Sequence, residues 1–148
     1  MSVHVHVCTV IEATLSVTWS AIERVETHVD WMADAEAIRF TSDTHQGVGT
    51  EFECVTRIGP ARLVDTMSIT EWRPEEAMGV SHRGVVKGAG RFVLAGVDST
   101  HTRFCWDEHL DLPWWMGGAI AERAALPVLT RLWRGNLARL KLLVEKHA

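Results

Sequence analysis

Alternation of apolar and polar residues recurs along most of the chain and predicts a protein built mainly of strands. In the first run, residues 3–13, one face carries Val3, Val5, Val7, Thr9 and Ile11, and the other carries His4, His6, Cys8 and Val10. Later runs, separated by Gly, Pro, Asp and Ser turn signals, cover residues 37–43, 50–58, 61–72, 77–84, 85–97 and 101–112. Because the connections between these later runs are short, we expect seven strands in one antiparallel sheet.

Helical spacing interrupts the strands directly after the first run. We expect a short helix with Ser16 as its N-cap and with Trp19, Ile22 and Val25 on its apolar face. A second short helix should open at Thr27 or His28. Two short helices placed before any hairpin would lie across one end of a curved sheet.

A long amphipathic helix is predicted from Pro127 to the C-terminus. Proline suits a first helical position because its missing N–H has no intrahelical partner there. The apolar face of this helix is formed by Leu129, Leu132, Trp133, Asn136, Leu137, Leu140 and Leu143. No helix of similar length is predicted upstream, so this face must lie on the sheet. Gly117 and Gly118 would each cost about 1 kcal/mol inside a helix. We expect a bend there, either the hinge of a lid or, as we favour, a simple turn of the chain.

The same alternation assigns side chains to the interior of the sheet. Apolar residues of inward parity include Phe52, Met67, Val80, Phe92, Phe104 and Trp106. Three titratable residues fall inside by the same rule, namely Asp65, His82 and Glu108. Because a buried unpaired carboxylate is costly, each must be paired, hydrogen-bonded, near water or functional, and Arg39 could pair with one of them if it points inward. We favour a satisfied internal polar cluster over a catalytic role.

Composition and charge exclude several classes of function. The 148 residues are 47% hydrophobic, which is enough to bury a core, and we expect a single domain spanning residues 1–148. The net charge of −4 is spread along the chain without a basic patch that would indicate nucleic-acid binding. No apolar run approaches the roughly 20 residues that cross a bilayer, and no secretory leader is expected. We expect a monomer or a homodimer.

Cysteine and histidine usage weighs against disulfides and metals. Cys8, Cys54 and Cys105 are three in number, far apart and without C-x-x-C spacing, so we predict neither a disulfide nor a zinc knuckle. A reducing, cytoplasmic location is the simplest expectation. His4, His6 and Cys8 do place three potential metal ligands on one side of a strand. We favour an exposed polar face for them, because a metal site would have to recruit further ligands, and we expect no metal and no cofactor.

In order and spacing, these elements resemble the START-related helix-grip superfamily (SRPBCC), and within it the polyketide cyclase/dehydrase-like branch. The stretches that carry the resemblance are VIEATLSVTWSAIERVETHVDWMADA (10–35), GVGTEFECV (47–55), ITEWRPEEAMGV (69–80), GRFVL (90–94), TRFCWDEHL (102–110) and NLARLKLLVEK (136–146). The resemblance implies an α+β fold in which a curved, seven-stranded antiparallel sheet wraps around a long C-terminal helix, with two short helices after the first strand. It also implies a cavity between sheet and helix.

The function predicted from these observations is the binding or transport of a hydrophobic small molecule, such as a lipid or a polyketide, without catalysis. The expected ligand-binding residues are Phe52, Met67, Val80, His82, Phe92, Phe104, Trp106, Glu108, Trp115, Leu129 and Trp133. One alternative is a polyketide cyclase or dehydratase that uses Asp65, His82 or Glu108 as acid or base. Another is a protein-interaction or toxin-like module that exposes Trp114 and Trp115, since adjacent tryptophans cannot both face the core.

Overall fold

The computed structural model describes residues 2–148, apart from the side chain of residue 116. Along the chain the elements are β1 (Ser2–Ile11), α1 (Leu15–Ile22), the 3₁₀ helix η1 (Val25–Asp30), β2 (Ala35–Phe40), β3 (Glu51–Ile58), β4 (Ala61–Arg73), β5 (Ala77–Arg83), β6 (Lys87–Asp98), β7 (His101–Asp111), the 3₁₀ turn η2 (Trp114–Met116) and α2 (Gly118–Lys146). All the predicted strands are present, with bounds that differ by a few residues.

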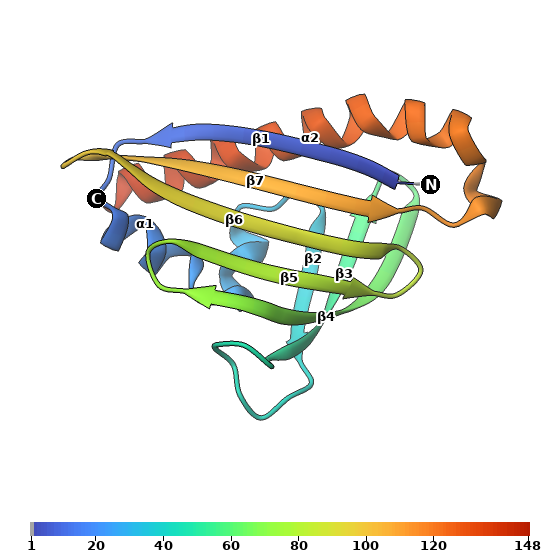
Figure 1. The fold of residues 1–148 in the computed structure, drawn as a ribbon, viewed down its shortest axis with the longest axis horizontal. Helices are drawn as coiled ribbons and strands as arrows, with labels where there is room; N and C mark the ends of the chain where they lie inside the picture. Colours follow the sequence, from blue (N-terminus) through green and yellow to red (C-terminus); the bar gives the residue numbers. More distant parts are fainter. Residues whose placement is uncertain (1) are drawn as a thin grey trace.

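The seven strands form one sheet in the order β1-β7-β6-β5-β4-β3-β2, and every neighbouring pair is antiparallel. From β2 to β7 each strand pairs with the next one in the chain, while β1 pairs with β7. The sheet is curved, and α2 runs alongside β1 (Figure 1). The predicted α+β helix-grip fold, with two short helices after the first strand, is therefore confirmed.

The two short helices begin at other residues than predicted. Thr14, not Ser16, is the N-cap of α1, and its Oγ1 accepts a hydrogen bond from the backbone N–H of Val17 at 3.2 Å. The 3₁₀ helix η1 begins at Val25, before the predicted opening at Thr27 or His28. The prediction went wrong because a tight 3₁₀ turn has a shorter period than the α-helical spacing used to find it.

The C-terminal helix begins at Gly118 rather than at Pro127, which lies inside it. The alanine-rich stretch before Pro127 has high helix propensity. The prediction gave more weight to the tendency of proline to break helices, and so it began the helix too late. The predicted bend does occur: Gly117 and Gly118 have φ angles of 114° and 61°, a left-handed conformation that glycine adopts without strain. It lies at the start of the helix and turns the chain from η2 into α2.

A buried asparagine fixes α2 to the segment that precedes β2. Asn136 is fully buried, its Oδ1 accepts from the backbone N–H of Ala33 at 3.0 Å, and its Nδ2 donates to Asp34 at 2.8 Å. Around it, the buried face of the helix consists of Leu129, Trp133, Leu137, Leu140 and Val144. The apolar stripe thus gives the helix its affinity for the sheet, and Asn136 fixes its position along it.

Cys8 and Cys105 form a disulfide, contrary to the prediction that there would be none. They lie 97 residues apart in sequence, but the register of β1 on β7 places them opposite one another. Cys54 is free and buried. Disulfides persist mainly in oxidising compartments. The cysteines therefore no longer support the predicted cytoplasmic location, which stays a prediction. Within residues 2–148, no helix is long and apolar enough to span a membrane.

Candidate functional site

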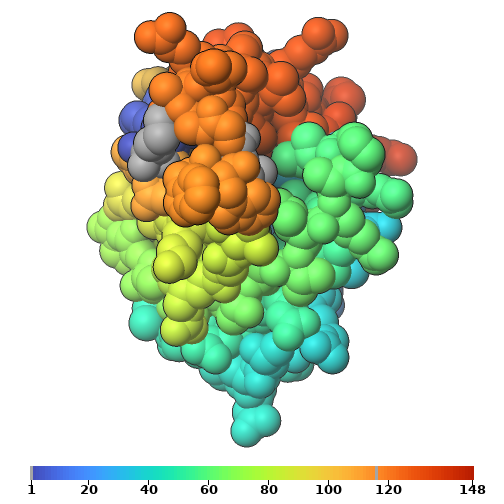
Figure 2. All heavy atoms as spheres, turned by 90° about the vertical axis from the view of Figure 1, so that its right-hand side faces the viewer, coloured from blue at the N-terminus to red at the C-terminus, as the bar shows by residue number. Residues whose placement is uncertain are grey.

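A cavity of about 150 Å³ lies between the inner face of the sheet and α2. Its walls come from η1, from β2 to β7, and from Leu129 and Trp133 of α2. Ile58 and Leu63, at the turn between β3 and β4, also line it and are partly exposed, so the cavity approaches the surface at that end. Figure 2 views this end of the molecule, where the green β3–β4 region lies beside the orange segment that leads into α2.

Most of the predicted ligand-binding residues lie in the cavity wall. They are Phe52, Met67, Val80, His82, Phe92, Trp106, Glu108, Leu129 and Trp133. Phe104 is completely buried instead, packed between Trp31 and Phe92 behind the wall. Trp115 does not line the cavity and is 62% exposed, because η2 lies beyond the end of β7 with no sheet face beneath it. Its neighbour Trp114 is exposed as well.

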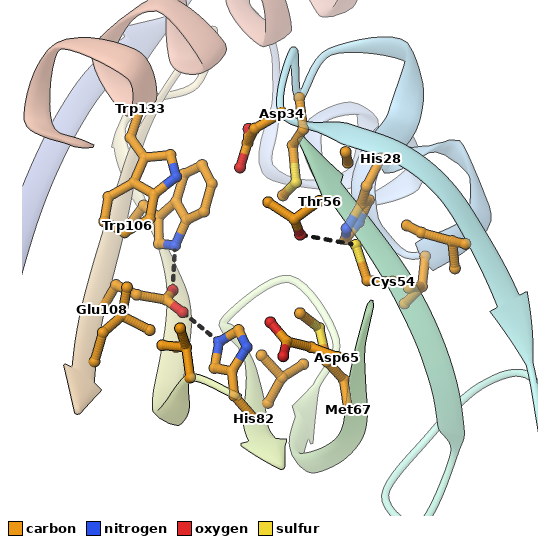
Figure 3. Close-up of a pocket in the computed structure, with 18 of the residues that line it drawn as sticks. His28, Asp34, Cys54, Thr56, Asp65, Met67, His82, Trp106, Glu108 and Trp133 are labelled. Atoms are coloured by element: carbon orange, nitrogen blue, oxygen red, sulfur yellow. Dashed lines mark hydrogen bonds and ion pairs between the residues drawn. The ribbon is translucent and has the colours of Figure 1, made fainter. Parts of the chain in front are cut away.

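A hydrogen-bonded row of three side chains forms the polar part of the wall (Figure 3). The indole N–H of Trp106 donates to Glu108 Oε2 at 2.7 Å, and His82 Nε2 contacts the other carboxylate oxygen of Glu108. Both members of the His82–Glu108 pair are nearly inaccessible, with side chains 11% and 4% exposed. Two of the three predicted titratable residues are thus brought together inside a mostly apolar cavity.

Glycines on β6 make room for this pair. His82 on β5 and Glu108 on β7 are separated by β6, where Gly88 lies opposite His82 and Gly90 lies opposite Glu108. A Cβ atom on Gly90 would lie 2.2 Å from Glu108 Oε2. Because the middle strand carries no side chains at these positions, side chains from its two neighbours can meet above it. This function of the glycines was not predicted from the sequence.

The electrostatics of the pair favour a charged imidazole. Burial disfavours the imidazolium, but the hydrogen bond and charge of Glu108, together with the charge of Asp65, raise the pKa of His82 above its usual range. Burial also raises the pKa of Asp65, and the charge of His82 opposes that rise. At neutral pH the cavity therefore contains an imidazole that holds its proton more firmly than an exposed histidine does.

Asp65 lies beside the pair but outside the hydrogen-bonded row (Figure 3). It is buried, and its Oδ1 has no hydrogen-bond partner within residues 2–148. The suggested pairing with Arg39 is wrong, because Arg39 is exposed and donates to Glu53 at 2.8 Å on the outer face. A buried carboxylate oxygen with no partner is a candidate contact for a polar group of a ligand.

His28 and Cys54 are among the titratable residues of the wall that were not predicted as site residues. His28, from η1, donates its Nε2–H to the backbone carbonyl of Ile22 at 2.7 Å. Burial lowers the pKa of His28 to about 4, against the effect of that hydrogen bond, so its imidazole is neutral at pH 7. Burial raises the pKa of the Cys54 thiol to about 11, which keeps it protonated and poorly nucleophilic. His28 was missed because its 3₁₀ helix has no clear apolar period.

No family model and no curated protein sequence matches the chain. Solved structures do match. TTHA0849 from Thermus thermophilus is 14% identical with a TM-score of 0.84, over 98% of this chain and 99% of that one. The Zhui aromatase/cyclase from Streptomyces sp. R1128 is 12% identical with a TM-score of 0.83, and the match covers 99% of this chain and 95% of that one. A START superfamily protein from Mycobacterium smegmatis is 12% identical with a TM-score of 0.71, and the match covers 97% of this chain and 95% of that one. The chain therefore shares the fold of these three proteins.

Proposed function

We propose that this protein binds a small, mostly apolar molecule that carries at least one polar oxygen, inside the cavity between the sheet and α2. The observation that carries the proposal is the buried His82–Glu108 pair in a mostly apolar wall. An imidazolium costs free energy to bury, and a ligand carbonyl or hydroxyl that accepts a hydrogen bond from it would offset part of that cost. Binding sites of this kind combine apolar walls with a few oriented polar groups.

The aromatic walls favour a ligand with a flat ring. The ring centroids of Trp106 and Trp133 lie 5.1 Å apart, and Phe92 meets Trp106 edge-on at 5.3 Å. Aromatic side chains in these arrangements stabilise a further ring placed against their faces or edges. The free volume of about 150 Å³ suits a ligand of ring size, or one end of a longer molecule that extends toward the β3–β4 turn.

The first experiment is native mass spectrometry of the protein purified from its own source, followed by organic extraction and uptake assays with fatty acids, sterols and aromatic ketones. We expect a stoichiometric apolar ligand, or uptake of an aromatic ketone. Leu129→Trp should fill the cavity and abolish uptake, whereas Leu142→Trp, on the exposed face of the same helix, should leave it unchanged. Protein that is ligand-free and takes up none of the panel would contradict the proposal, as would equal uptake by the two variants.

A second candidate is acid–base catalysis on a ketone, for which the Zhui aromatase/cyclase is a structural neighbour. The observation that favours it is the gathering of His82, Glu108 and Asp65 around one cavity. His82 would exchange a proton with the substrate, and Glu108 would orient the imidazole and stabilise its charge. His82→Gln should then lose turnover of a polyketide-like ketone while retaining its binding. Unchanged turnover in that variant would exclude His82 as the acid or base.

A further inference from the structure

The outer face of the sheet carries a group of potential metal ligands on two neighbouring strands. The register of β1 on β7 sets three pairs side by side, His4 with His109, His6 with Asp107, and Cys8 with Cys105. The residues that alternate with them along β1 and β7 are buried on the inner face of the sheet. These six side chains therefore share the outer face. The β1 half of this group was noted in the sequence, together with its need for further ligands. Strand β7 supplies them.

Three imidazoles surround the carboxylate of Asp107. His4 Nε2 contacts Asp107 Oδ1, His6 Nδ1 lies 3.4 Å from the same oxygen, and His109 Nε2 lies 3.8 Å from Oδ2. The rings of His4 and His109 stack with centroids 4.0 Å apart and planes within 8° of parallel. One carboxylate can balance the charge of only one imidazolium. The arrangement therefore provides more imidazole nitrogen atoms than a single ion pair with Asp107 uses.

We propose that His4, Asp107 and His109 bind a first-row transition-metal dication such as Zn²⁺, with His6 as a fourth ligand. One ligand atom from each of His4, Asp107 and His109 already lies within 4.8 Å of the others. Around Zn²⁺ with bonds of about 2.0–2.2 Å, ligand atoms are roughly 3.3 Å apart. Small rotations of half-exposed side chains close that gap. Imidazole and carboxylate donors together suit zinc and its neighbours rather than magnesium or calcium, which take oxygen ligands.

The arginine that faces Asp107 on the neighbouring strand is paired with another carboxylate. Arg91 on β6 lies opposite Asp107 in the register, but its guanidinium is engaged by Glu71, with hydrogen bonds of 2.6 Å and 3.1 Å. A bidentate pair of this kind holds the guanidinium in place. Among the described residues, the ion pairs of Asp107 are thus with the three histidines and not with this arginine.

The disulfide separates this site from a second set of donors. His6, Cys8 and Cys105 also lie close enough to hold a metal, but cysteine ligates as a thiolate and both sulfurs are bonded to one another. His4, Asp107 and His109 need no reduction to bind. The site is also independent of the proposed ligand cavity, because adjacent residues of β7 point to opposite faces of the sheet.

The test is isothermal titration of the full chain with ZnCl₂, after removal of metal with a chelator and with the disulfide intact, as checked by thiol titration. We expect one Zn²⁺ per chain, unaffected by excess Mg²⁺, and a rise in Tm on binding. Asp107→Asn and His109→Ala should each weaken binding by at least about tenfold. His147→Ala is the matched control and should bind as the unaltered chain does. His147 is exposed and precedes the C-terminal residue, and the C-terminus lies at the opposite end of the molecule from the N-terminus (Figure 1).

Three results would overturn the assignment. The first is the absence of zinc binding by the chain with its disulfide intact. The second is equal affinity in Asp107→Asn, His109→Ala and His147→Ala. The third is zinc binding that appears only after reduction by a phosphine and disappears in a Cys8→Ser, Cys105→Ser variant, which would place the metal on the thiolates. The circular dichroism of each metal-free variant must match that of the unaltered chain, so that lost affinity is not lost folding.

Discussion

Successive residues of β7 place the same chemistry on the two faces of the sheet. Glu108 points inward and joins an imidazole and an indole with almost no exposure, whereas Asp107 points outward among three imidazoles, with its side chain 36% exposed. Inside, water cannot replace a lost partner, so the His82–Glu108 pair affects folding stability strongly. Outside, solvent screens the charges, so the Asp107 group contributes little to stability and is free to exchange its contacts for a metal ion.

The largest expected effect comes from removing the inner carboxylate. Glu108→Ala leaves His82 and the Trp106 N–H buried without a partner, and we expect a loss of about 3–5 kcal/mol in the free energy of unfolding. The matched outer substitution, Asp107→Ala in metal-free protein, should cost about 0–1 kcal/mol. Urea unfolding of both variants measures the difference. Equal losses would mean that burial does not distinguish the two faces.

The second prediction concerns pH and the neutral imidazole of His28. Its pKa falls from the usual 6.5 to about 4 in the folded chain, which corresponds to about 3 kcal/mol of stability. The contribution is fully present above pH 6.5 and is lost as the pH falls toward 4, because the unfolded chain then binds a proton that the folded chain excludes. His28→Gln keeps a donor for the Ile22 carbonyl but cannot titrate, so its urea midpoint should fall less over this range.

His82 and Asp65 provide the contrast within the cavity. Both have a raised pKa. For His82, burial lowers the pKa, and the hydrogen bond and charge of Glu108 together with the charge of Asp65 outweigh that effect; for Asp65, burial itself raises the pKa. Their contributions to stability are therefore present at low pH and are lost as the pH rises through each folded pKa. Their pH dependence is opposite to that of His28. The contribution of His28 to stability must therefore be measured as the difference between the unaltered chain and His28→Gln. An identical pH slope in the variant would contradict a buried, neutral His28.

The smallest loss of stability expected inside the cavity tests the space that β6 leaves for the pair. Gly90→Ala places a methyl group on Glu108 Oε2 and should cost about 1–3 kcal/mol, because the carboxylate must move away from His82 and Trp106. Gly135→Ala on α2 is the matched control. Its nearest neighbour would lie at 3.6 Å, an ordinary contact, and helix propensity should make it neutral or stabilising. Thermal unfolding of the two variants compares them, and a Gly90→Ala protein as stable as the control would refute the argument.

The sequence was sufficient for what depends on local periodicity. Strict alternation located the strands and correctly turned Asp65, His82 and Glu108 inward, because each parity follows from neighbours in the same strand. It could not bring Cys8 to Cys105, or His4 to His109, since those pairings depend on the register between strands far apart in the chain. That register is invisible when each strand is considered by itself.

Local context also misled in the C-terminal segment. Pro127 has the appearance of a helix start, yet the preceding alanines extend the helix to Gly118. Trp115 was expected to contact the ligand as an aromatic residue of the C-terminal segment, but it lies beyond the end of β7. Neither error could be avoided without knowing where β7 stops relative to the first turn of the helix.

The position of β1 at one edge of the sheet has a consequence for how the chain folds. This strand is synthesised first, but its hydrogen-bonding partner β7 is the last strand made, and α2, which also packs on it, comes later still. Its apolar residues, Val3, Val5, Val7 and Ile11, therefore remain unpaired until β7 has left the ribosome. Closing so distant a contact is slow, and during that interval the nascent chain is open to aggregation and to chaperones.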